Sequence, residues 1–428
     1  MEINKMIQQG IIELKALTGR KEENLVDIIS EIKRLKKIAV FFGNCQIEFL
    51  ENQIYEMSSF KDDYVIIRMP AVHLMGEEEK KHGLNNDLLK AVDLFIYQEV
   101  HDVQKYGELI TENITRCLSD TCIKLCIPNC FFKGYHPQMI KNERNTMLHS
   151  KYNEGGIVPY GDSVLQECFE ANMDIDALEM YMYSDDCISK SMINDNLAFT
   201  FRELKRREQV CDITISDFIE SNYKEKYLFY SPSHPANIVL HELGKRILDK
   251  LGYNTKDFIY SENQAENNKF EVLIYPVVKK TLGLSFDKET FYFCSSLCQH
   301  RDTLLGYALK YRKYCFPELR INGIGYPPLD MTYNIKIDTN YVEERLSSCM
   351  TYINGTVHLA LYLTALKEIP NVTIVYIPKE IAPKKTYLTA ASGLKASYPV
   401  QILSNGEIRL NKTGNMDSII MIDTMWHV

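Results

Sequence analysis

Short apolar runs that alternate with stretches of helical periodicity constrain the fold of the first third of this chain. In order, these segments are 37–42, a helix from Gln46, 63–69, a helix near 84–91, 92–98, a helix near 104–117, and 122–128. Strands that alternate with helices predict an α/β fold of the flavodoxin type, a parallel sheet with helices on both faces. In such folds the loops at the carboxyl ends of the strands form the site.

The first apolar run ends in a turn that carries a cysteine. Gly43 and Asn44 break the run, and Cys45 and Gln46 open the next helix. A thiol at a helix N-terminus lies beside unpaired backbone N–H groups at the positive end of the helix dipole, which lower its pKa and can hold a developing oxyanion. A buried cysteine at a turn would explain the same residues.

A second turn, far along the chain, supplies a histidine. It ends another apolar run at Ser231 and opens a helix that we expect from Ile238 to about Leu251. His234 in this turn can face Cys45, and a Cys–His pair can act as nucleophile and base.

These two turns together resemble the WcbI family of capsule polysaccharide biosynthesis proteins, which are relatives of the SGNH esterase superfamily. In that superfamily the nucleophile follows a Gly-Asp turn and the base lies in a late Asp-x-x-His-Pro turn. Here Gly43, Asn44 and Cys45 take the first place, and Ser231-x-x-His234-Pro235 takes the second. The resemblance covers roughly residues 36 to 312.

The resemblance implies further site residues at two other strand ends. Gln98 follows the third run, where the middle block of the family would fall, and Asn129 follows the fourth. In the SGNH superfamily a glycine and an asparagine at such ends donate to the oxyanion. Gly43 and Asn129 are therefore the candidate donors, with Asn44, Gln46 and Gln98 beside them.

The departures from the SGNH pattern concern the nucleophile and the group that orients the base. The pattern has a serine where this chain has Cys45, and an aspartate where it has Ser231. A Cys–His pair depends less on the missing carboxylate, because a thiolate is accessible near neutral pH. Glu99 or Asp102 could substitute for it from a neighbouring loop.

The resemblance also implies binding of coenzyme A or acetyl-coenzyme A. A basic helix expected at 196–209 carries Arg202, Lys205 and Arg206, which could meet the phosphates of such a cofactor. The ordinary explanation of such charges is a solvated helix face. No glycine-rich phosphate loop supports the cofactor independently.

The cysteines are interpreted as reduced thiols rather than as metal ligands. There are twelve in 428 residues, and no signal peptide precedes them. Cys122, Cys126 and Cys130 are expected to lie in the core, since no second ligand pair has zinc-like spacing. Cys294 and Cys298, with a nearby histidine, fit one turn of an amphipathic helix, and a metal site is the lesser alternative.

Composition favours a soluble protein with more than one core. The net charge of −8 and the pI near 5.8 argue against a nucleic-acid partner, and no apolar run is long enough to span a bilayer. The absence of a signal peptide predicts a cytoplasmic location.

The N-terminal 36 residues are expected to form an interrupted amphipathic helix. Its apolar stripe contains Leu25, Ile28, Ile29, Ile32 and Leu35, spaced alternately by threes and fours. This spacing suggests a coiled-coil seam, and we favour self-association into a dimer or trimer over docking onto the chain's own core.

The C-terminal part changes composition. After the α/β domain at 37–315 we expect a linker at 316–347 and an antiparallel β-sandwich at 348–428, with turns at Asn354-Gly355 and Asn405-Gly406. This module resembles β-domains of phage tail-fibre and baseplate proteins through its strand at 355–357 and its hairpin at 402–408. That resemblance implies a sugar-binding or trimerising role, and a cell-surface or virion location becomes an alternative.

The site predicts chemistry on acyl groups of a polysaccharide. Cys45 would be the nucleophile and His234 the base. Acyl transfer with coenzyme A is the favoured function, and an SGNH-type carbohydrate esterase is the rival. A third possibility is an inactive glycan-binding or structural module.

Overall fold

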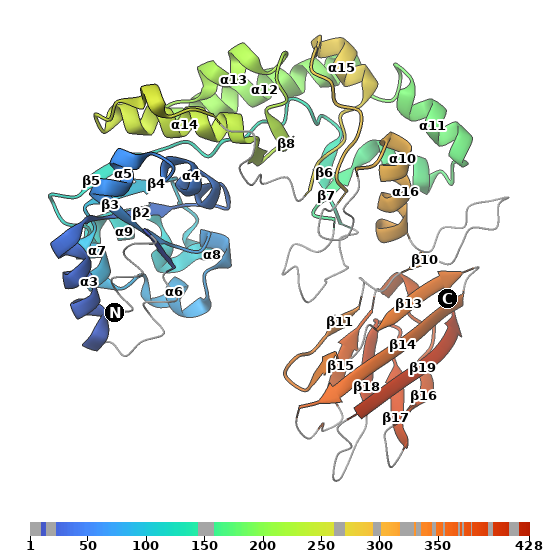
Figure 1. Ribbon diagram of the computed structural model, residues 1–428. Helices are drawn as coiled ribbons and strands as arrows, with labels where there is room; N and C mark the ends of the chain where they lie inside the picture. The colour runs from blue at the N-terminus through green and yellow to red at the C-terminus, as the bar shows by residue number, and fades with distance from the viewer. Residues whose placement is uncertain are drawn as a thin grey trace. The chain divides into compact units, whose positions relative to one another are not determined.

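The computed structural model is shown in Figure 1. It describes residues 10–13, 23–143, 158–260, 270–293, 301–316, 329–330, 335–344, 348–353, 356–366, 369, 372–377, 379–392, 397–410 and 419–428. The chain forms two compact units: residues 1–137, 190–274 and 278–288 make the first, and residues 138–189, 275–277 and 289–428 make the second. Residues 138–189 thus fall in the same unit as the C-terminal part of the chain.

A five-stranded parallel sheet forms the centre of the first unit, which confirms the predicted α/β class. Its order is β1-β3-β2-β4-β5. The strands are β1 (Ile11–Glu13), β2 (Lys37–Phe42), β3 (Tyr64–Arg68), β4 (Leu94–Tyr97) and β5 (Ile123–Cys126). In the register Phe42 pairs with Tyr97, and Tyr97 pairs with Cys126. The carboxyl ends of β2, β4 and β5 therefore meet at one edge of the sheet.

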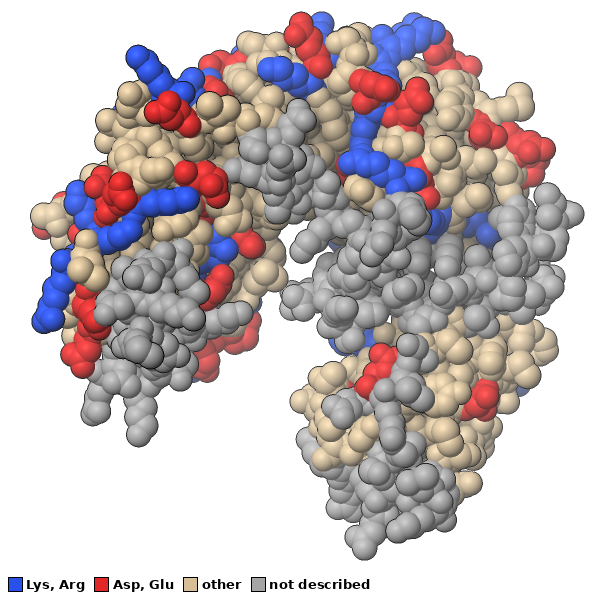
Figure 2. All heavy atoms as spheres, in the orientation of Figure 1, with Lys and Arg blue, Asp and Glu red and all other residues tan. Residues whose placement is uncertain are grey.

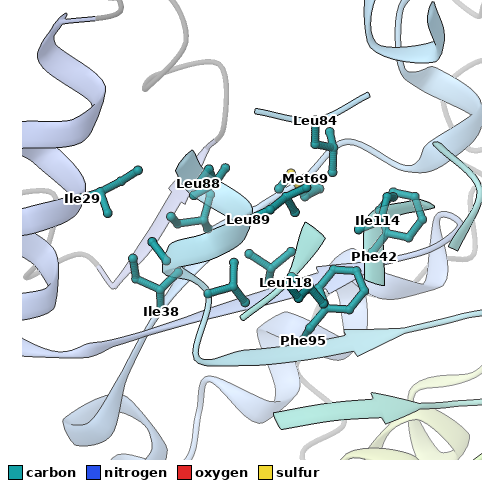
Figure 3. Packing of buried hydrophobic residues seen from close by; sticks show 14 of the residues in the cluster. Ile29, Ile38, Phe42, Met69, Leu84, Leu88, Leu89, Phe95, Ile114 and Leu118 are labelled. Atoms are coloured by element: carbon teal, nitrogen blue, oxygen red, sulfur yellow. The ribbon is translucent and has the colours of Figure 1, made fainter. Parts of the chain in front are cut away.

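Helices cover both faces of this sheet. On one face α3 (Glu23–Leu35), α7 (Asn86–Ala91) and α9 (Thr111–Cys117) share a core with alternate residues of β2, among them Ile38 and Phe42 (Figure 3). On the other face lie α4 (Gln46–Ile54) and α5 (Ser58–Asp63). The helix α14 (Asn237–Lys250) packs closely on α4 at Gly244, where an added Cβ would lie 3.2 Å from Ile54.

The N-terminal stripe packs on this core, which corrects its expected role as a coiled-coil seam. Leu25, Ile28, Ile29 and Ile32 are buried in the cluster of Figure 3, and only Leu35 is exposed, at 60%. An amphipathic pattern identifies the apolar face of a helix but not its partner. The helix expected in these residues is also wrong at β1, which is a strand that pairs in parallel with β3.

Further elements complete the first unit. They are η1 (Val72–Leu74), α6 (Glu77–His82), α8 (Val103–Tyr106), η2 (Gly107–Leu109), α12 (Lys190–Glu208), α13 (Ser216–Asn222), β8 (Phe229–Ser231), β9 (His234–Pro235), η4 (Thr255–Asp257) and α15 (Pro276–Leu282), of which α15 extends into the second unit at residues 276–277. The strands β8 and β9 form a tight antiparallel pair that presents the His234 turn.

The second unit combines helices with an antiparallel sheet. Its first part contains β6 (Met139–Lys141), β7 (Tyr160–Asp162), α10 (Ser163–Glu170), α11 (Ile175–Tyr183) and α16 (Leu304–Cys315). Asp162 begins α10 by accepting a bond from Leu165 N, and its buried carboxylate also accepts from Tyr275 Oη at 3.1 Å.

Ten strands of the second unit form one continuous sheet. They are β10 (Leu329–Asp330), β11 (Lys336–Ile337), β12 (Val342–Glu344), β13 (Cys349–Ile353), β14 (Thr356–Ala365), β15 (Val372–Tyr376), β16 (Tyr387–Ser392), β17 (Ser397–Ile402), β18 (Glu407–Leu410) and β19 (Ile419–His427), with η6 (Lys379–Ile381) between β15 and β16. The strands other than β12 are joined by hydrogen bonds in one continuous row, and β12 pairs with β14 beside that row.

Three predictions for this region are corrected or confirmed by the sheet. A single sheet, curled on itself, replaces the two packed sheets of the expected sandwich. Strands β10, β11 and β12 lie in the expected linker. The sequence alone does not predict them, because strands of two or three residues are too short to show a period. The expected turn at Asn405-Gly406 is confirmed, with Gly406 at φ +89°. Residues 354 and 355 of the other turn lie outside the described residues.

Candidate active site

The turn between β2 and α4 carries Cys45. Asn44 N donates to Gln98 Oε1 at 2.9 Å, and Gly43 O accepts from Val72 N at 2.8 Å. Glycine is needed at 43, because an added Cβ would lie 2.5 Å from Gln98 Oε1. Cys45 is half-buried at the N-cap of α4, and its side chain makes no capping bond. The sulfur therefore lies at the helix start, as the sequence predicts, without being used to cap it.

Gln46 joins three loops to this turn. Its Nε2 donates to Asn129 Oδ1 at 3.0 Å, to Cys130 O at 2.8 Å and to Ser233 O at 2.7 Å. Its Oε1 accepts from Cys130 N and from Gln98 Nε2. The residue is only 2% exposed. Both ends of its amide are thus used to hold the protein together.

Asn129 is oriented by two donors. Its Oδ1 accepts from Asn44 Nδ2 and from Gln46 Nε2, both at 3.0 Å. Because the oxygen is held, the Nδ2 group of the same amide is turned away from these partners, in a residue that is half-buried. This geometry suits the donor role that the resemblance implies. Gln98 differs, since its amide is buried and bonded at both ends.

His234 is oriented by a serine. Ser231 Oγ lies 2.7 Å from His234 Nδ1, at the position from which a carboxylate acts in the SGNH pattern. Burial lowers the pKa of His234 to about 4, and the nearby His73 adds to the shift. A hydroxyl can fix the ring but brings no charge to stabilise the imidazolium. The imidazole is therefore neutral at pH 7.

Neither of the two expected substitutes for that carboxylate is bonded to His234 in the residues that the structure describes. Glu99 contacts His101 at 3.3 Å, and Asp102 begins α8 by accepting from Lys105 N at 3.1 Å.

The cysteine turn and the histidine turn are bonded to one another. Gln46 Nε2 donates to Ser233 O, and Phe132 N donates to Pro232 O at 2.8 Å. Cys45 precedes one partner of the first bond and His234 follows the other. The strand ends of β2 and β5 and the β8–β9 turn therefore form one bonded cluster, which contains both predicted catalytic residues.

His73 is a site residue that the sequence analysis missed. It lies in η1, which is tied to the cysteine turn by the bond from Val72 to Gly43, and its charge acts on His234. Desolvation lowers the pKa of His73, with a smaller effect of Lys105. The available signal was its place just after β3, but four residues of Met, Pro, Ala and Val separate it from the strand.

The basic helix α12 lies in the same unit, and two of its four cations at 202–207 have acidic partners. Lys205 pairs with Glu220 at 2.6 Å, and Arg206 pairs with Glu203 at 3.0 Å. Figure 2 shows the same mixture of acidic and basic side chains over the visible face of the molecule.

Two other arginines of α12 stack on aromatic rings. Arg202 lies over Phe199, and Arg207 lies over Phe131 at 5.0 Å, two residues from Asn129. Arg207 makes no ion pair with the residues that the structure describes, so it is the better placed cation for an anionic ligand.

Metal ligands and membrane spans were also searched in the described part of the chain. No group of three His, Cys, Asp or Glu side chains there could hold a metal ion. Cys122, Cys126 and Cys130 are buried, as expected of core thiols, whereas Cys294 and Cys298 lie outside the described residues. No described helix is long and apolar enough to cross a membrane.

Comparison with known proteins supports the family that the two turns suggested. A family model described as "Polysaccharide biosynthesis enzyme WcbI" matches residues 38–256, more than half of the chain. No curated protein matches.

A solved structure of WcbI, called a novel polysaccharide biosynthesis enzyme, matches with a TM-score of 0.55 and 20% identity. The match covers 65% of this chain and 89% of that one, and the description specifies a native protein without a disulfide bond between coenzyme A and a cysteine. At this identity the likeness shows the fold. The family model spans both turns of the candidate site, and the chain belongs to the WcbI family of polysaccharide biosynthesis enzymes.

Proposed function

We propose that this protein transfers an acyl group, in the simplest case acetyl, from coenzyme A to a polysaccharide through Cys45 and His234. The observation that carries the proposal is the bonded cluster in which Gln46 holds the cysteine turn against the turn of a neutral, serine-oriented histidine. Membership of a family of polysaccharide biosynthesis enzymes supports the glycan substrate, and the relative described with coenzyme A supports the acyl carrier.

The chemistry follows from the protonation of His234. When its Nδ1–H donates to Ser231 Oγ, Nε2 keeps a lone pair and can take the proton of the Cys45 thiol. The thiolate attacks the thioester carbonyl, the bond between the acyl carbon and the coenzyme A sulfur breaks, and coenzyme A leaves as a thiol with the proton from His234. A sugar hydroxyl, deprotonated by His234, then attacks the acyl group on Cys45, and Cys45 leaves as a thiolate that His234 protonates again. Asn129 Nδ2 and the backbone N–H groups at the start of α4 are the proposed oxyanion donors.

The phosphates of coenzyme A need cations near this edge of the sheet. Arg202, Lys205 and Arg206 remain candidates, and Arg207 joins them because of its stacking on Phe131. Calorimetry is expected to show saturable binding of coenzyme A that weakens as salt is added, since charge pairs near the surface are screened. If no heat of binding is measured at millimolar coenzyme A, this cofactor is excluded from the proposal. The remaining alternatives are then the esterase and the inactive module.

Substitution of Cys45 tests the reaction itself. Cys45→Ala is expected to lower acyl transfer from acetyl-coenzyme A to an acetylatable glycan by roughly a thousandfold or more, with the unfolding temperature nearly unchanged. His234→Asn should fall to the same level, because nucleophile and base act as a unit. Full activity of the Cys45→Ala variant would show that Cys45 is not the nucleophile.

A matched control and a second substrate separate the rivals. Cys117→Ala removes another half-buried thiol, on α9, and should leave transfer unchanged. Release of acetate from a chromogenic ester, without transfer, would support the esterase. Activity of the wild type in neither assay would support the inactive module.

A further inference from the structure

A pair of cysteines lies in the first unit, close to the candidate site but separate from Cys45. Cys126 is the last residue of β5, and Cys211 follows α12. Their sulfurs are 3.7 Å apart although 85 residues of sequence separate them, and Cys126 is the hydrogen-bond donor.

The backbone holds the two segments together around this pair. Cys126 N donates to Asp212 Oδ2 at 2.7 Å, and Asp212 N donates to Cys126 O at 2.9 Å. Cys211 Sγ also donates to Arg207 O, at the end of α12. The two thiols are therefore presented to each other by bonded neighbours rather than by a loose contact.

The two thiols differ in exposure and in acidity. Cys211 is half-buried, whereas Cys126 is buried, with only 2% of its surface exposed. The bond between them raises the pKa of Cys126 and lowers that of Cys211, and burial raises the pKa of Cys126 further. The accessible thiol is thus the better nucleophile, and the interior thiol is in position to follow it.

We propose that Cys126 and Cys211 are a redox-active dithiol that a small-molecule disulfide converts into an intramolecular disulfide. The Cys211 thiolate attacks one sulfur of the small disulfide and releases the other half as a thiol. Cys126 then loses its proton and attacks Cys211 Sγ in the mixed disulfide, releasing the second half. The protein is oxidised by two electrons, and the small disulfide is reduced to two thiols.

The bond would link the end of β5 to the end of α12. Asn129 lies three residues after Cys126, and Arg207 lies four residues before Cys211. Oxidation would therefore fix the segment that carries the oriented amide of Asn129 against the segment that carries Arg207. The proposal does not depend on the acyl-transfer function, because its readouts are covalent and structural.

Peptide mapping of the full chain tests the proposal. After incubation of the native protein with oxidised glutathione and trapping of free thiols, we expect a peptide that links Cys126 to Cys211, loss of two hydrogens in the intact mass, and reversal by dithiothreitol. The unfolding temperature should rise by several degrees on oxidation, because the bond restricts the unfolded chain.

Single substitutions separate the two steps. Cys211→Ser should abolish the link, and Cys126→Ser should leave one glutathione attached to Cys211. Cys117→Ser is the matched control and should leave the link intact. If the Cys126→Ser variant does not fold, the peptide maps of the wild type and of Cys211→Ser are sufficient to test the proposal.

Three results would overturn the proposal. The first two are the absence of a link between Cys126 and Cys211 in excess oxidised glutathione, and a link from Cys126 that survives Cys211→Ser. A link that involved Cys45 in place of either residue would also overturn it.

Discussion

The parallel sheet of the first unit and the antiparallel sheet of the second place their polar residues differently. In β2 the five residues from Ile38 to Phe42 are all buried. In β14 burial mostly alternates, so that His358 faces outward between buried Val357 and Leu359. A sheet covered on both faces leaves polar side chains only at strand ends, whereas a half-covered sheet can carry them along its length.

This difference explains where each unit can hold chemistry. Polar residues that follow the parallel strands converge at one edge, where Gln46 is bonded to Asn129 and to Ser233 of the β8–β9 turn. The polar residues of the antiparallel sheet pair across strands at the surface, as His358 does with Asp423 at 2.7 Å. Convergence at an edge gives a buried, connected site, and dispersal along a face gives separate exposed pairs.

Alanine substitution at consecutive positions is the strongest test of this comparison. Phe41→Ala and Phe42→Ala should each lower the free energy of unfolding by roughly 3–5 kcal/mol, because both side chains are fully buried on opposite faces. In β14 the cost should alternate: about 2–5 kcal/mol for Leu359→Ala, and below about 1 kcal/mol for the exposed pair broken by His358→Ala. Urea unfolding measures each value, and equal costs at 358 and 359 would contradict the alternation.

Removal of the Gln46 amide tests the convergence. Gln46→Ala leaves Cys130 N, Cys130 O and Ser233 O without this partner, and we expect a loss of about 3 kcal/mol in the free energy of unfolding. Gln104→Ala, an exposed glutamine on α8, is the control and should change little. A loss below about 1 kcal/mol would show that water replaces the amide and that the cluster is not held by it.

Replacement of Ser231 by a charged residue tests how the residue at position 231 sets the pKa of His234. In the wild type the acid limb of the activity profile should lie near pH 4, because His234 loses its function as a base only when it is protonated. Ser231→Asp should raise the pKa of His234 by roughly 1–3 units, and the limb should move upward with it. Ser221→Asp, at an exposed serine of α13, should leave the acid limb unmoved.

The same pKa shift predicts a pH dependence of stability. The pKa of His234 is lowered from 6.5 to about 4 on folding, so the unfolded chain binds more protons between these values. The contribution of this residue to stability is then present above pH 6.5 and is lost as the pH falls to about 4. A flat stability over this window in the wild type, or one unchanged by His234→Asn, would contradict the neutral buried imidazole.

The parallel sheet and much of its site were predictable because the signals are local. The apolar runs are long enough to identify strands, and Gly43, Gln98 and Asn129 follow them directly, so their meeting at one edge follows from the topology. The buried stripe of α3 was predicted as apolar but assigned to the wrong partner, because its spacing serves a coiled coil and a sheet equally well.

Other features depend on contacts that no local pattern records. Strand β1 has three residues within a stretch of helical spacing and exists because β3 offers a free edge. His73 lies at the site because the backbone N–H of its neighbour Val72 donates to Gly43 O. Ser231 stands three residues before His234 in the sequence, but only the folded turn brings its hydroxyl to Nδ1.

The bond from Gln46 to Ser233 joins residues 187 positions apart, and this separation has a consequence during protein synthesis. A ribosome that adds roughly 5–20 residues per second needs about 10–40 s to cover that distance. Through this interval the strands and the cysteine turn exist without the histidine that completes them. The emerging chain can build its sheet early, but it stays without the complete Cys–His pair until the β8–β9 turn leaves the exit tunnel.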